Sequence, residues 1–443
     1  MDILIAIILL VLNCMVAKSI NRSHPNLYLA RFLYFYYIIE IVVGLIVVGC
    51  NYNFLLPVIH SISLPVREVL GLWSFVVLVA GLFIKFGISL ACQGHQDRLL
   101  EPFTTRYKLA SVDFPVNRVS NIFAIIFTLA VLFPFVPQFP YALRIITLSF
   151  DFLPLFIGLY FTQLSKGRRW LWVLLLLINM TANIIQASRG LAVIPIALFM
   201  IGYLISISDK PSFRKQIAMI LLISAPFFSI FGKIQDFREE FGRGNDVTAE
   251  NAYLLFYYLL NSSSGESKTL ANSVADGLGR FINVGDFAIV HMTPSHVPHR
   301  GFIQMRDEIK SAVTLYGSEG SAKFREGRGN LKYGSGVLTD YGFSINENTS
   351  VGMGLLGDSY SRFGIFGVAI YLFLMSFIIT KMELYIGKHH QSVFGIILFF
   401  FLAYTFLYTI YGNSYFAFFK KIIFNGVLVF FVSKAITMKN ILR

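Results

Sequence analysis

The sequence predicts an all-α polytopic membrane protein with about eleven transmembrane helices and one large extracytoplasmic loop. Hydrophobic residues make up 56% of the 443 positions and charged residues only 14%, whereas a soluble chain carries roughly a quarter charged residues. Uncharged apolar stretches of about 20 residues, the length that crosses a bilayer, recur along the whole chain. These two observations argue against a disordered chain, an ordinary soluble enzyme and a nucleic-acid-binding protein.

The apolar stretches divide the chain into an N-terminal membrane bundle (1–232), a large loop (233–362) and a C-terminal group of membrane helices (363–443). About eight spans are expected in the bundle and about three in the last part. The cysteines lie inside or at the ends of apolar stretches, so helix packing rather than disulfides is expected to hold the fold. In chain order, the expected spans are residues 3–17, 32–50, 69–91, 119–136, 145–164, 170–186, 191–207, 216–232, 363–380, 392–411 and 416–437.

The distribution of basic residues between the short connections predicts the orientation. One set of connections carries 18 Lys and Arg, and the other set carries only three, namely Arg67, Arg144 and Arg189. Because cytoplasmic loops are enriched in Lys and Arg, the N-terminus is expected outside and the C-terminus inside. The chain begins Met1-Asp2 without a basic segment, which favours an uncleaved first helix. The net charge of +13 then reflects the cytosolic face and does not indicate a polyanionic partner.

The large loop, residues 233–362, is expected on the outer side. It carries 13 basic and 15 acidic residues, so it is nearly neutral. A connection of this length without a long helical period is uncommon unless it is functional. The chemistry is therefore expected in this loop and at the neighbouring helix ends.

The first candidate site lies at the outer end of the sixth span. Asn179, Asn183 and Gln186 stand at i, i+4 and i+7, so the three amides share one helix face that leads to Arg189. One interpretation is interhelical hydrogen bonding, with the arginine extended towards the headgroups. The other is a cavity wall with Arg189 at its mouth, where a guanidinium binds phosphate through two parallel hydrogen bonds.

The second candidate site is the segment that opens the ninth span. It places four polar residues in the expected first helical turn, where free N–H groups and the helix dipole favour an anion: Asp358, Ser359, Tyr360 and Arg362. The alternative is that Asp358 or Ser359 caps the helix, while Gly364 and Gly367 allow close helix packing.

The large loop contributes further candidates. Arg280, Arg325 and Arg328 belong to a series of loop arginines that also includes Arg300 and Arg306. The loop histidines are separated by prolines, which prevents a helix that could direct them to one metal. We therefore expect no metal site and no cofactor, although one histidine could act as a general base. The histidines are His291, His296 and His299, and the prolines are Pro294 and Pro298.

These features together resemble the Wzy-type O-antigen or oligosaccharide repeat-unit polymerases. The resemblance rests on the many spans, on Ser188-Arg189-Gly190 at an outer helix end, on the large late loop and on the segment from Gly357 to Gly367, GDSYSRFGIFG. It implies a GT-C-like glycosyltransferase fold in the bacterial inner membrane with an active site that faces the periplasm. The implied substrates are two undecaprenyl-pyrophosphate-linked oligosaccharides, and a chain-length regulator protein is a further implied partner.

The resemblance also implies roles for the candidate residues. Arg189 and Arg362 would bind the pyrophosphate, joined by Arg280, Arg325 or Arg328 from the loop, while Asp358 or Glu347 would act as the base or orient the acceptor hydroxyl. An O-antigen ligase of the same fold stays open as an alternative. A flippase would be expected to have two similar halves and short loops, and the sequence shows neither. A membrane acyltransferase would need a histidine inside a span, and none of the eight histidines lies in the middle of a predicted span.

Overall fold

The structure is a computed structural model, and every structural statement below concerns the residues that it describes. These are residues 2–24, 27, 29–49, 54–56, 59–64, 66–93, 116–132, 149–185, 195, 196, 198–200, 202, 203, 250, 253, 254, 257, 287, 354–388, 393–412 and 421–441. The chain divides into two compact units that alternate along the sequence. The first comprises residues 1–111, 275–389 and 405–422, and the second comprises residues 112–274, 390–404 and 423–443.

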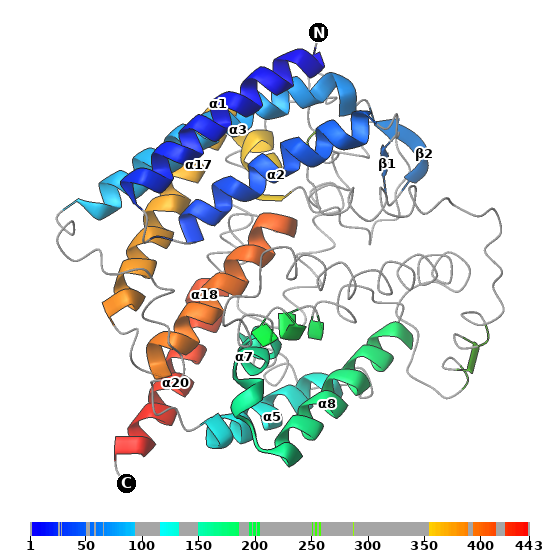
Figure 1. The fold of residues 1–443 in the computed structure, drawn as a ribbon, viewed down its shortest axis with the longest axis vertical. Helices are drawn as coiled ribbons and strands as arrows, with labels where there is room; N and C mark the ends of the chain where they lie inside the picture. Colours follow the sequence, from blue (N-terminus) through cyan, green and yellow to red (C-terminus); the bar gives the residue numbers. More distant parts are fainter. Residues whose placement is uncertain are drawn as a thin grey trace, which may run out of the picture. The chain divides into compact units, whose positions relative to one another are not determined.

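The first unit is a group of long helices arranged around α3 (Val66–Cys92). Three helices, α1 (Asp2–Ser23), α2 (Leu29–Gly49) and α17 (Gly354–Lys388), pack against α3 (Figure 1). The approach of α17 is close because Gly87 has no side chain: a Cβ there would lie 2.6 Å from the carbonyl oxygen of Phe373. Such small residues at helix contacts are typical of membrane bundles.

A short antiparallel hairpin connects α2 to α3 and is the exception to the helical prediction. Strand β1 (Phe54–Leu56) pairs with β2 (Ile59–Leu64), with Phe54 opposite Leu64 and Leu55 opposite Ser63. The register shifts between Leu55 and Leu56. The hairpin falls in the connection that the charge distribution places outside, where backbone groups need not all be satisfied within one helix.

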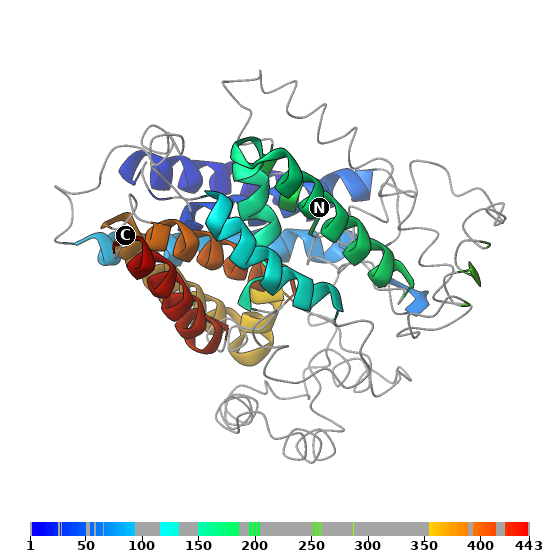
Figure 2. The same ribbon diagram turned by 90° about the horizontal axis from the view of Figure 1, so that it is seen from below.

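The second unit contains α5 (Val116–Leu132), α7 (Leu153–Tyr160) with its 3-10 extension η4 (Phe161–Gln163), and α8 (Lys166–Ile185). Figure 2 shows α5 in cyan beside α8 in green. The Phe123 and Phe156 rings hold α5 against α7 in an edge-to-face contact. The unit also includes α18 (Val393–Gly412) as far as residue 404, and α20 (Gly426–Ile441), which follows the π-helical turn η5 (Lys421–Asn425).

Five helices in the described part of the chain are long and apolar enough to cross a membrane. They cover Ile3–Ser23, Leu29–Ile46, Val69–Cys92, Lys166–Ile185 and Arg362–Ile386. The chain is therefore a polytopic α-helical membrane protein, as predicted. Shorter apolar helices lie within three further predicted spans, at Val119–Leu132, Leu153–Gln163 and Ile397–Phe406. The predicted span 216–232 lies outside the described residues, as does much of 191–207.

The predicted end of the first helix was wrong: the helix continues to Ser23 rather than ending at residue 17, because Lys18 ends the apolar run without interrupting the backbone hydrogen bonds. Within the span expected at 145–164, α7 begins at Leu153, where Pro154 suits the first helical turn, and residue 149 before it is also helical. The ninth span, expected from residue 363, agrees at its start with the candidate span Arg362–Ile386, and α17 extends further back to Gly354.

Candidate functional site

The site is built on a break near the start of α17. Phe363 (φ −139°, ψ 19°) and Gly364 (φ 61°, ψ −143°) leave helical geometry, so the segment from Gly354 to Arg362 is a short helix separate from the long one. The positive φ of Gly364 is a conformation that residues with a Cβ rarely adopt. A Cβ at Gly367 would lie 2.2 Å from the carbonyl oxygen of Ser359, so the two parts of α17 fold closely together. Both glycines are thus required by the backbone.

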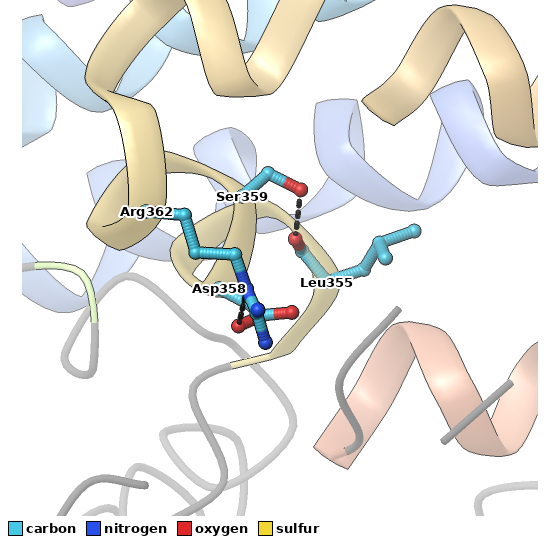
Figure 3. Close-up of polar contacts among 4 residues, drawn as sticks. All are labelled: Leu355, Asp358, Ser359 and Arg362. Atoms are coloured by element: carbon cyan, nitrogen blue, oxygen red, sulfur yellow. Dashed lines mark hydrogen bonds and ion pairs between the residues drawn. The ribbon is translucent and has the colours of Figure 1, made fainter. Parts of the chain in front are cut away.

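The short helix carries a buried ion pair. Arg362 Nε donates to Asp358 Oδ1 over 2.9 Å, one helical turn apart, and both side chains are at most 1% exposed (Figure 3). A buried charge is costly unless it is paired, so each side chain depends on its partner. Asp358 and Arg362 were therefore correctly predicted to lie in one cluster.

The predicted position of this cluster within the helix was wrong. Asp358, Ser359 and Arg362 lie inside the short helix, before the break, and not in the first turn of the long one. The alternative in which Asp358 or Ser359 caps the helix is also wrong. The Ser359 hydroxyl donates to the carbonyl oxygen of Leu355 over 2.8 Å, and the Asp358 carboxylate accepts from Arg362 (Figure 3).

Tyr360 connects the ion pair to a series of buried aromatic rings. Its ring centroid lies 4.9 Å from that of Phe287, which comes from the predicted outer loop. The ring centroid of Phe287 lies 4.9 Å from that of Trp73 on α3. The ring centroid of Trp73 lies 6.4 Å from that of Tyr37 on α2. Burial raises the pKa of Tyr360, so its phenol stays protonated and can donate a hydrogen bond. The series joins α2, α3, the loop and α17 within the first unit.

Two aromatic side chains in this series bury donors that have no hydrogen-bond partner among the described residues. They are the hydroxyl of Tyr37 and the indole N–H of Trp73, and both side chains are fully buried. One turn along α2, the carboxylate side chain of Glu40 is also buried. The sequence analysis missed all three residues. Glu40 could have been found, because it is the only charged residue in the stretch 32–50.

The predicted amide face of α8 is partly described. Asn183 Nδ2 donates to the backbone oxygen of Asn179 over 2.8 Å and to its side-chain oxygen over 3.1 Å, and both residues are buried. These two amides therefore share one buried face, as their spacing predicted. Whether that face lines a cavity stays a prediction.

The remaining candidates lie outside the described residues. They are Gln186, Arg189, Arg280, Arg325, Arg328, Glu347 and the three loop histidines. Arg189 falls in the second compact unit and Arg362 in the first, so their joint binding of one pyrophosphate stays a prediction. In the described part of the chain, no group of three or more His, Cys, Asp or Glu side chains could hold a metal ion.

No protein-family model matches this chain, and neither a curated protein nor a solved structure matches it significantly.

Proposed function

We propose that the protein is a metal-independent glycosyltransferase of GT-C-like fold with about eleven spans. It would polymerise undecaprenyl-pyrophosphate-linked oligosaccharide repeat units into surface polysaccharide at the outer face of the bacterial inner membrane. The observation that carries the proposal is the buried Arg362–Asp358 pair at 2.9 Å, in the segment before the long membrane helix. In this proposal, the guanidinium of Arg362, held through Nε by Asp358, would donate hydrogen bonds to the departing pyrophosphate.

The reaction exchanges one bond at the anomeric carbon of the growing chain. The bond to the pyrophosphate oxygen breaks, and a bond to an acceptor hydroxyl oxygen of the new repeat unit forms. The hydroxyl proton passes to a carboxylate, and undecaprenyl pyrophosphate leaves with the electron pair of the broken bond. The enzyme must therefore stabilise negative charge on one side of the reacting carbon and accept a proton on the other.

The ion pair suggests how the two predicted carboxylates divide these tasks. Asp358 accepts a hydrogen bond from Nε of Arg362, which fixes the plane of the guanidinium. We assign Asp358 to positioning Arg362 and Glu347 to accepting the proton. Arg189, with Arg280, Arg325 or Arg328, would add positive charge around the pyrophosphate, and Tyr360 and the α8 amides Asn179, Asn183 and Gln186 would bind substrate.

The decisive test is complementation of a bacterial strain that lacks its own repeat-unit polymerase, provided that the repeat unit is accepted. Expression of this chain should restore a ladder of surface polysaccharide on a gel, and the Arg362→Lys variant, at equal membrane abundance, should lose most of it. A single-repeat band with the wild-type chain would contradict the proposal. Complementation of a ligase-deficient strain instead would assign the chain to the ligase alternative.

The predicted orientation is tested by thiol labelling in intact cells. In a background with Cys14, Cys50 and Cys92 replaced by alanine, a Ser318→Cys variant should react with an impermeant reagent. A Lys166→Cys variant should react only after the cells are opened, because Lys166 belongs to the basic set of connections. The reverse pattern would place the site on the cytoplasmic side.

Metal independence is tested with purified protein and lipid-linked repeat units. Turnover should survive EDTA, since the proposed charge stabilisation comes from arginines. If EDTA abolished turnover and magnesium or manganese restored it, Asp358 and Glu347 would be better interpreted as metal ligands.

A further inference from the structure

We propose that Tyr37, Trp73 and Glu40 form a carbohydrate subsite of this enzyme, on the α2 and α3 side of the Asp358–Arg362 pair. The inference rests on the proposed function, and it names the part of the substrate that these three residues contact. They would bind hydroxyl groups of a sugar in the lipid-linked oligosaccharide. None of the roles argued so far uses these residues.

The two buried aromatic donors are the first evidence for this subsite. The Tyr37 hydroxyl and the Trp73 indole N–H are buried, and neither has an acceptor in the described part of the chain. A buried donor without an acceptor is destabilising, so a natural protein rarely keeps two of them on adjacent side chains. Their rings are in edge-to-face contact with centroids 6.4 Å apart, so the two side chains that carry the donors are neighbours. A ligand with acceptor oxygens would satisfy them.

Matched side chains elsewhere show that this chain does provide acceptors for buried aromatic donors. Tyr34, one turn before Tyr37 on α2, donates its hydroxyl to Asn13 Oδ1 over 2.6 Å. In the second unit, Trp172 donates its indole N–H to Ser120 Oγ over 2.8 Å. All four aromatic side chains are at most 1% exposed, so burial alone does not explain the difference.

The third residue supplies an acceptor. Glu40 lies three residues after Tyr37, within the candidate span Leu29–Ile46, and its side chain is 1% exposed. Ionisable residues inside membrane spans are rare because they are costly, and they generally mark functional sites. A sugar hydroxyl both donates and accepts, so a carboxylate one helical turn from a buried donor suits a sugar better than it suits a purely anionic group.

The aromatic rings connect this cluster to the proposed reaction centre. The ring centroid of Phe287 lies 4.9 Å from the ring centroids of both Trp73 and Tyr360. Along the sequence, Tyr360 is two residues from each member of the ion pair. Aromatic faces suit the apolar face of a sugar ring, while the donors and the carboxylate suit its hydroxyls.

The test uses three conservative variants, each with a matched control. Tyr37→Phe and Trp73→Phe remove the donors, with Tyr34→Phe and Trp172→Phe as controls. Glu40→Gln removes the charge, with Glu383→Gln as control, because buried Glu383 accepts a hydrogen bond from the backbone N–H of Leu29 over 3.1 Å and glutamine keeps that acceptor. Polysaccharide length is measured in the complemented strain, and turnover on lipid-linked repeat units and the thermal midpoint are measured for each purified full-length protein.

The inference expects the three subsite variants to shorten the ladder and lower turnover at least tenfold, while their thermal midpoints match or exceed those of the controls. The controls should keep a normal ladder. A normal ladder from the subsite variants would overturn the inference while leaving the proposed function intact. Shortened ladders with lower midpoints than the controls would also overturn it, because the role would then be structural. If the wild-type chain itself gave no ladder, the proposed function would fail.

Discussion

The two compact units differ in the kind of polar group that they bury. In the described part of the first unit, the buried polar side chains include four ionisable ones with formal charge, Glu40, Asp358, Arg362 and Glu383. In the described part of the second unit, the buried polar side chains are neutral: Ser120, Ser149, Asn179, Asn183 and Ser433. Burying a charge costs far more than burying an amide or a hydroxyl. Among the described residues, the buried side chains with formal charge therefore all lie in the first unit.

The same contrast extends to aromatic donors. In the second unit, the Trp172 indole has its acceptor on Ser120, and the helices α5 and α8 that carry the two residues gain a stabilising contact. In the first unit, the indole of Trp73 has none among the described residues. Satisfied donors stabilise a fold, whereas unsatisfied donors cost stability and are retained where they serve another purpose. The predictions below test this difference.

The largest expected effect comes from breaking the buried ion pair. Asp358→Ala removes the carboxylate that neutralises a buried guanidinium, which should cost about 3–5 kcal/mol of stability. Asn183→Ala in the second unit removes only neutral hydrogen bonds and should cost about 1 kcal/mol. Thermal unfolding of both variants in the same detergent checks the comparison. Equal losses would mean that the buried charges of the first unit contribute no more to stability than the neutral hydrogen bonds of the second.

The next largest effect is expected from Arg189, and it tests whether the second unit also contributes a charge to the proposed glycosyl transfer. Arg189→Lys keeps the charge but cannot form two parallel hydrogen bonds to one phosphate, so turnover should fall on the order of a hundredfold while the protein still inserts. Turnover on lipid-linked repeat units and membrane abundance are the measurements. A normal ladder from this variant would leave Arg189 as an anchor near the headgroups and would confine the reactive charges to the first unit.

A smaller effect separates the two buried tryptophans. Trp172→Phe should lower stability by about 1 kcal/mol more than Trp73→Phe does, because only the former loses an existing hydrogen bond. Both substitutions remove the same ring volume, so the packing cost largely cancels in the difference. Thermal midpoints of the two purified variants give the answer. A greater loss for Trp73→Phe would show that its indole N–H already has a stabilising partner.

The smallest effect is a pH dependence in the first unit. Burial and, to a lesser extent, the positive charge of Lys85 lower the pKa of His24 from 6.5. The unfolded chain therefore takes up a proton at a higher pH than the folded protein, and stability should decline as the pH falls below about 6.5. His24→Gln should flatten that decline in thermal unfolding between pH 7 and pH 5. An unchanged slope would show that other groups dominate it.

Particular residues show which parts of the candidate site could be predicted from the sequence. The spacing of Asn179 and Asn183 correctly placed both on one helix face, because helical periodicity is a local property. The proximity of Asp358 and Arg362 could also be predicted from the sequence, since residues four apart on a helix are neighbours. Their place before a break could not be predicted in this way, because the non-helical conformation of Phe363 and Gly364, with Gly367 packed closely against Ser359, interrupts the helical periodicity.

The sequence by itself determined the membrane class and the approximate helix positions, because hydrophobic length and charge asymmetry act along the chain and need no knowledge of the partners. Only the tertiary structure brought Tyr37, Trp73, Phe287 and Tyr360 into one aromatic series. These residues come from four segments spread over more than 300 positions. Whether a buried donor finds an acceptor is likewise decided by packing: Tyr34 and Tyr37 lie one turn apart on the same helix, and only Tyr34 meets Asn13.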